Sequence, residues 1–150
     1  MFEFAKRFFR GGGTPPGITM ADDQVRKCGE LIRRCVVAQF NEAGLPLMTA
    51  ASPYRSLVLG YVATLAEEIG TRLSRDEGQG VSMLICFIAM EGVDAAPEHE
   101  DLMREFTELT DAREYMFGQG GAIALEDFPG LAKQIPPRGL ALELMRMRAQ

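Results

Sequence analysis

Residues 81–90 read VSMLICFIAM, and every position in this stretch except Ser82 carries an apolar side chain. An element that is apolar all round is covered by other elements on several sides. The run is too short to span a membrane and fits either a buried helix or a buried strand. We predict a helix, because Met, Leu and Ala favour helices, no segment with strand alternation lies nearby, and a capping box, SRDE at residues 74–77, precedes it.

Two amphipathic helices are predicted ahead of this central stretch. The first opens with a cap at Thr19, repeats apolar residues every three or four positions as far as residue 40, and is followed by Gly44, which suits a left-handed helix stop. The second covers residues 54–73 and follows Ser52-Pro53, a serine cap and a proline suited to the first helical position.

The segment after the central stretch holds one more amphipathic helix and an ambiguous break. Pro97 and the acidic residues after it mark the start of a helix whose apolar side extends to Leu109. Either Asp111 and Glu114 cap a new helix, or the first helix runs on. The glycines of GQGG at residues 118–121 then form either a loop or a close helix crossing.

The C-terminal part is predicted to be less regular. Residues 122–128 form a short turn or helix, and Pro129-Gly130 and Pro136-Pro137 bracket an irregular stretch. Residues 139–150 end the chain as an amphipathic tail.

The domain organisation follows from the first break in the chain. Residues 11–17, GGGTPPG, do not continue a helix and indicate a hinge. They separate residues 1–10, called the Phe-rich arm below, from residues 18–150. We predict one all-α domain at residues 18–150, a bundle of about five helices, with a flexible N-terminal arm and hinge at residues 1–17.

Composition narrows the class of function. The chain of 150 residues has 16 basic and 21 acidic residues, a net charge of −5, which argues against nucleic-acid binding because phosphate contacts need a basic surface. The three cysteines, Cys28, Cys35 and Cys86, do not make a disulfide framework and indicate buried thiols in a reducing compartment. The N-terminus lacks the basic-then-apolar order of a secretory signal. We predict a cytoplasmic protein.

No catalytic, cofactor-binding or metal-binding residue is assigned from the sequence. The single histidine, His99, lies in a polar helix start and is predicted to be solvated. Cys28 and Cys35 are seven residues apart, about 10 Å along a helix, which is too far for two ligands of one zinc ion. The glycines at residues 118–121 follow no predicted strand and precede no Lys-Ser/Thr pair, so they do not indicate a nucleotide loop. An enzyme is the less favoured class.

The Phe-rich arm is the first candidate interaction surface. Four phenylalanines within nine residues are unusual for a chain end that precedes a hinge. Three interpretations stay open: the arm packs on its own bundle, inserts into a partner subunit, or lies on an anionic membrane surface as an amphipathic helix. The candidate partner-binding residues are Phe2, Phe4, Phe8 and Phe9, beside the basic Lys6, Arg7 and Arg10.

Two charged segments are further candidate surfaces. Residues 94–114 hold eight acidic residues and two arginines, which form either a solvated face or a docking surface for a basic partner. The tail places Arg146 and Arg148 beside Met145 and Met147, whose adaptable side chains suit partner binding. Packing of the tail in the core, or pairing of the tail with the acidic segment, are the alternatives.

These features lead to two hypotheses of different classes. The first is a small cytoplasmic helical protein that acts through protein–protein contacts, as a regulator, adaptor or chaperone-like factor, and that self-associates as a homo-oligomer. The alternative is a small-molecule-binding or enzymatic bundle with a pocket between its helices. Tyr54, Tyr61 and Glu68 would line that pocket.

Overall fold

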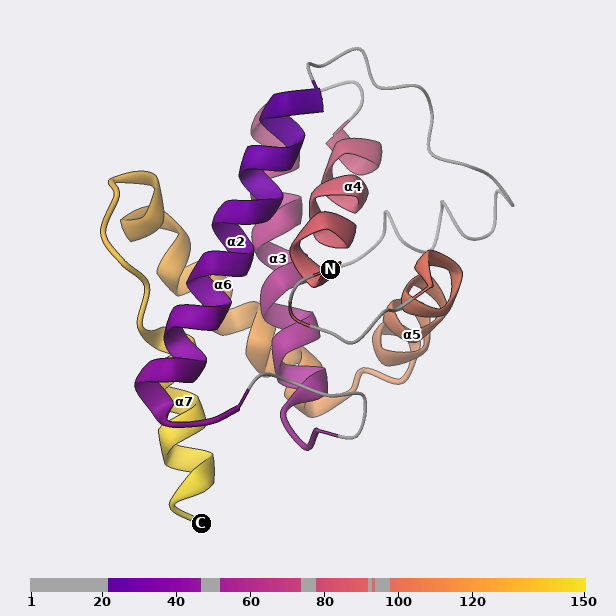
Figure 1. Ribbon diagram of the computed structural model, residues 1–150. Helices are drawn as coiled ribbons and strands as arrows, with labels where there is room; N and C mark the ends of the chain where they lie inside the picture. Colours follow the sequence, from indigo (N-terminus) through magenta and orange to yellow (C-terminus); the bar gives the residue numbers. More distant parts are fainter. Residues whose placement is uncertain (1–21, 47–51, 74–77, 92, 94–97) are drawn as a thin grey trace.

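The apolar stretch at residues 81–90 is helical, which confirms the prediction over the rival strand. It forms most of α4 (Gly78–Glu91) in the computed structural model, which describes residues 22–46, 52–73, 78–91, 93 and 98–150. The described residues form six helices and no strand, so the all-α class is confirmed and the helix number is six instead of about five. In chain order the helices are α2 (Asp22–Ala43), α3 (Arg55–Leu73), α4, α5 (His99–Asp111), α6 (Tyr115–Ala132) and α7 (Gly139–Arg148) (Figure 1).

The centre of the bundle is α3. Residues 57–66 are all buried, because α3 packs against α2 on one side and against α4 and α6 on others. The stretch predicted to be central, in α4, packs on α2 and α3 and leaves Leu84 and Ile88 only half-buried. The sequence hides the central position of α3 because Gly60, Tyr61 and Thr64 interrupt its apolar run.

Two predicted helix boundaries lie on either side of the connection between α2 and α3. Gly44 has φ +70° and ends α2, which confirms the left-handed stop. Ser52 is a cap, because its side-chain oxygen accepts a hydrogen bond of 3.1 Å from the backbone N–H of Tyr54. The helix itself begins at Arg55, so the prediction that Pro53 is the first helical residue is wrong: residues 53 and 54 form a turn ahead of α3.

The ambiguous break after α5 is a true break. Helix α5 ends at Asp111, Arg113 turns the chain with φ 50°, and α6 begins at Tyr115. The cap of α6 is Glu114, whose carboxylate accepts a hydrogen bond of 2.7 Å from the backbone N–H of Phe117. Asp111 is therefore the last residue of α5 and not a cap, and the alternative of one continuous helix is wrong.

Helix α6 is longer than the sequence indicates. It continues through residues 118–121 and ends at Ala132, so the prediction of a short element at residues 122–128 is wrong. Pro129 lies inside the last turn of α6, and the irregular stretch begins only after the helix ends. Pro129 has no backbone N–H to donate to the carbonyl oxygen of Leu125 one turn earlier, so α6 lacks that one hydrogen bond in its last turn.

The glycines of α6 make a close crossing with α3. A Cβ atom at Gly120 would lie 2.0 Å from the carbonyl oxygen of Leu57, and a Cβ atom at Gly60 would lie 2.0 Å from the carbonyl oxygen of Phe117. Only glycine allows two helix backbones to approach so closely. The crossing confirms one of the two predictions for residues 118–121 and excludes the loop.

Several predicted starts fall outside the described residues. These are the Phe-rich arm with its hinge, the cap at Thr19, the capping box at residues 74–77, and the helix start at residues 94–97. Within the described part, α5 begins at His99 after an N-cap at Glu98. No helix there is long and apolar enough to cross a membrane.

Candidate functional site

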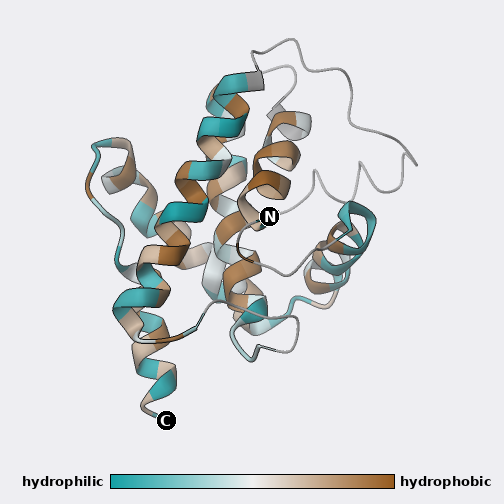
Figure 2. Cartoon of the chain, viewed as in Figure 1, coloured by the Kyte–Doolittle hydropathy of each residue, from teal (hydrophilic) through white to brown (hydrophobic). Residues whose placement is uncertain are grey.

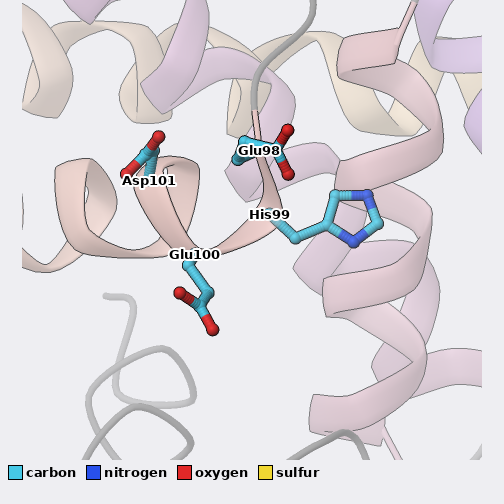
Figure 3. A pocket seen from close by; sticks show the side chains of 4 residues that line it. All are labelled: Glu98, His99, Glu100 and Asp101. Carbon is cyan, nitrogen blue, oxygen red and sulfur yellow. The ribbon is translucent and has the colours of Figure 1, made fainter.

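A pocket at the start of α5 lacks a convergent set of chemical groups. It has a volume of about 410 Å³ and is lined by Glu98, His99, Glu100 and Asp101. The three carboxylates point in different directions, whereas the imidazole reaches toward α4 (Figure 3). There the His99 ring stacks on Phe87 with 4.2 Å between ring centroids, while the residue remains exposed, as predicted. Across the described residues, no group of three or more His, Cys, Asp or Glu side chains could hold a metal ion.

The cysteines are poor nucleophiles. Cys35 and Cys86 are buried and Cys28 is half-buried, and all three are free thiols. Burial raises the pKa of each thiol above its ordinary value. Because the thiolate is the reactive form, these side chains stay protonated and inert near neutral pH. The prediction of buried thiols is confirmed for Cys35 and Cys86.

A chain of polar side chains lies inside the bundle where α2, α3, α6 and α7 meet. Gln39 donates a hydrogen bond of 3.1 Å to the hydroxyl oxygen of Tyr61, and this hydroxyl donates one of 2.9 Å to Asp127. Both ends of the chain reach the start of α7. The backbone N–H of Ala141 donates to Gln39 at 3.0 Å, and that of Gly139 donates to Asp127 at 3.2 Å. The network therefore supplies acceptors for the free N–H groups of the first turn of α7.

The electrostatics of this network point to a structural role. Burial raises the pKa of Asp127, while the hydrogen bonds from Tyr61 and from the Gly139 N–H act in the opposite direction. Burial also raises the pKa of Tyr61, so its hydroxyl stays protonated and keeps donating. The polar groups of the network are bonded to one another, and the arrangement fixes α7 on the bundle.

The Asp127 pKa predicts a specific pH dependence. Because the folded-state pKa is raised, the contribution of this group to stability is present below its ordinary pKa of 3.8 and is lost as the pH rises through the folded-state value. The variant Asp127→Asn lacks this titration. We expect its free energy of unfolding, relative to the natural chain, to rise with pH just above 3.8 and then level off, as measured by urea unfolding from pH 3 to pH 7. A difference that is constant over this range would contradict the raised pKa.

The three residues predicted to line a pocket have partners inside the fold. Tyr61 is fully buried and belongs to the polar network. Tyr54 is half-buried and packs against the hydrophobic core. Glu68 forms a salt bridge of 2.8 Å with Arg72, one turn further along α3. One signal in the sequence marked the network: Gln39 is a polar residue on the apolar stripe of its helix.

The apolar side of the tail packs in the core. Leu140 and Leu144 are fully buried. Met145 and Met147 are partly buried against the core, which favours the core interpretation of the tail.

The two tail arginines predicted to bind a partner have contacts within α7 and with α2. Arg146 bonds to Glu143 on its own helix. Arg148 donates a hydrogen bond of 2.7 Å to the carbonyl oxygen of Ala43 at the end of α2. The alternative in which these arginines pair with residues 94–114 of the same chain is therefore wrong, because both guanidinium groups bond elsewhere.

The acidic segment forms the outer side of α5. In Figure 1 this helix is set to one side of the others, and Figure 2 shows its outward side hydrophilic and its inner side hydrophobic. Glu105 binds Arg55 of α3 through two hydrogen bonds, of 2.6 and 2.8 Å, and Phe106 packs against Phe117. Five other acidic side chains of the segment are exposed and are called the acidic face below. The acidic face consists of Glu98, Glu100, Asp101, Glu108 and Asp111.

A second surface on the described bundle is apolar. Large apolar side chains are more than half exposed at Tyr115 (73%), Leu125 (54%), Ile135 (56%) and Leu142 (54%). On α6, apolar or small residues follow one another at intervals of three and four positions and therefore share one side of the helix. They are called the α6 stripe and are Tyr115, Gly118, Ala122, Leu125 and Pro129.

Ile135 and Leu142 lie near α6 but beside a different side of the helix from the α6 stripe. Ile135 follows the end of α6 and folds back over it, since a Cβ atom at Gly130 would lie 3.6 Å from the Ile135 side chain. Leu142 lies one turn after Gly139, which abuts α6 at Ile123. These two exposed side chains are therefore not part of the α6 stripe.

The candidate site is thus a pair of surfaces, one acidic and one apolar. Comparison with protein-family models, with curated proteins and with solved structures finds no match for this chain. The four phenylalanines predicted to bind a partner, Phe2, Phe4, Phe8 and Phe9, lie outside the described residues.

Proposed function

We propose that this chain acts through protein–protein contacts, as a regulator, adaptor or chaperone-like factor of the cytoplasm, and that it self-associates. The observation that carries the proposal is the exposed α6 stripe. Single exposed apolar residues are ordinary, but an apolar surface that follows one side of a helix is typical of an interaction site.

Two further observations support the same class of function. The side chains of Gln39, Tyr61 and Asp127 are bonded to one another, in the manner of a structural network. The acidic face supplies a charged border that would steer a basic partner toward the molecule. The cytoplasmic location is supported by three free thiols.

Deletion of residues 1–17 is expected to change the oligomeric state. Native mass spectrometry of the full-length chain should show a multiple of its 16.5 kDa mass, and the chain of residues 18–150 should show a smaller subunit number. The physical reason is that the deletion removes four phenylalanines, which carry large apolar surfaces.

Circular dichroism of both chains is the control, because the helical content of the bundle should persist without the arm. A full-length chain that is monomeric would contradict self-association. An equal subunit number in the two chains would show that the arm plays no part in it. A retained small molecule, visible as extra mass, would favour the alternative of a ligand-binding bundle.

A further inference from the structure

Gly118 is a glycine that the packing of the described chain does not explain. Gly60 and Gly120 are required by the close crossing of α3 and α6. In contrast, a Cβ atom at Gly118 would meet no atom of the described residues within 4 Å. A glycine inside a helix destabilises it relative to alanine, so its presence there needs another explanation. The open space at Gly118 lies on the outer side of α6, within the α6 stripe.

The spacing and the size of the residues in the α6 stripe suit the packing of bulky side chains from a partner. The stripe residues are spaced by three and four positions in alternation, which is the spacing of residues that face a partner helix in a coiled coil. Small residues, Gly118 and Ala122, lie between the larger Tyr115 and Leu125. The side chains are therefore shortest in the middle of the stripe, and the open space at Gly118 leaves room for a large apolar side chain from outside.

We propose that the Phe-rich arm of a second copy of this chain docks on the α6 stripe, with a phenylalanine ring over Gly118. This inference rests on the proposed self-association and names the surface that it uses. The arm offers bulky side chains at helical spacing, with Phe4 and Phe8 four positions apart. Large phenylalanines on the arm thus complement small residues on the stripe.

Charge complementarity selects the arm as the occupant. The arm carries Lys6, Arg7 and Arg10 against one acidic residue, Glu3. Helix α6 contains no lysine or arginine, and its exposed acidic residue is Glu126, because Asp127 bonds inside the bundle. The acidic face of α5 ends at Asp111, four positions before α6 begins, with Arg113 between them. Pairing of α6 with α6 of another copy would bring like charges together, whereas the arm brings opposite charges to this side.

The length of the linker favours the arm of a second copy over the chain's own arm. Helix α2 rises about 25 Å from Asp22 to Gln39. Gln39 bonds to Tyr61 at the level where α3 crosses α6 beside Gly118, and α6 lies about two helix spacings, each about 8–10 Å, from α2. Residues 11–21 reach about 40 Å when fully extended. A route around the outside of the same bundle is about as long as the fully extended linker. The chain's own arm would therefore reach the stripe only with the linker almost straight, whereas the arm of a second copy is not bound by this limit.

The substitution Gly118→Leu tests the proposal in the full-length chain. Leucine enters the open space at Gly118 without touching the core, so the chain should fold with a melting temperature equal to or above the natural one. Self-association should weaken about tenfold or more, as expected for loss of a central contact, when measured by native mass spectrometry over a dilution series. The matched control is Ala38→Leu, which adds the same side chain at an exposed helical position of α2.

A second variant and a cross-linking measurement complete the test. Leu125→Lys places a like charge opposite the basic arm and should also weaken self-association, on a folded chain. A chain with Phe8→Cys, mixed with a chain carrying Gly118→Cys and treated with a short thiol-reactive cross-linker, should give a covalent dimer of the two.

The outcomes separate this inference from the function on which it rests. If Gly118→Leu and Leu125→Lys associate as tightly as the natural chain, while deletion of residues 1–17 abolishes association, the arm binds another surface and the inference is wrong. A third chain carries both Phe8→Cys and Gly118→Cys. If only this chain is cross-linked, and only within itself, the chain's own arm lies on the stripe and the inference is wrong. A natural chain that is monomeric at every concentration would overturn the proposed function itself.

Discussion

Replacing Gly120 with alanine is expected to destabilise the protein by about 3 kcal/mol or more, at the upper end of the range for overpacked interiors. The added Cβ would lie 2.0 Å from the carbonyl oxygen of Leu57 and 2.8 Å from the backbone nitrogen of Tyr61. Both neighbours are backbone atoms of the central helix α3, so neither can rotate away. The two helices would have to separate, and the buried side chains along their crossing would lose contacts.

The chain contains a matched control two residues earlier in the same helix. Gly118→Ala adds the same methyl group where no described atom lies within 4 Å, and it should stabilise the protein by about 0.4–1 kcal/mol. Urea unfolding followed by circular dichroism measures both variants. If Gly120→Ala unfolds within about 1 kcal/mol of the natural chain, the backbones of α3 and α6 are further apart than the structure places them.

These glycines show where sequence reasoning stops. The pattern GQGG predicts either a loop or a close crossing, and nothing in the letters separates Gly118 from Gly120. The difference is that Gly120 faces α3 and Gly118 faces outward, which depends on how a distant helix is placed. Local features, such as the helix at residues 81–90 and the left-handed stop at Gly44, can be predicted from the sequence because they depend on residues within a few positions of one another.

The same limit applies to the charged residues. The sequence identifies an acidic segment and a basic tail but does not say which charges meet. In the structure Glu105 forms a salt bridge with Arg55 of α3, and Arg148 donates a hydrogen bond to the carbonyl oxygen of Ala43. Such pairs join positions far apart in the chain, so they become visible only after the helices have been packed.

Substitution of Gln39 by leucine is expected to cost about 2–3 kcal/mol and to loosen α7 first. Gln39 is 1% exposed and bonds to two helices at once, through Tyr61 and through the backbone N–H of Ala141. Leucine has a similar size but bonds to neither. The Ala141 N–H belongs to the first turn of α7, where no earlier turn supplies an acceptor, and a buried donor without a partner costs about 1–3 kcal/mol.

Hydrogen exchange distinguishes this local effect from a general loss of stability. In Gln39→Leu the amides at the start of α7 should exchange faster than in the natural chain, under conditions where the amides of α3 stay protected. Tyr61→Phe is the matched control: it removes the hydroxyl but leaves the bond from the Ala141 N–H to Gln39, so α7 should stay protected although global stability falls. Unchanged exchange of α7 in Gln39→Leu would mean that the buried side chains of Leu140 and Leu144 suffice to hold the helix, and that the polar network only fills the interior.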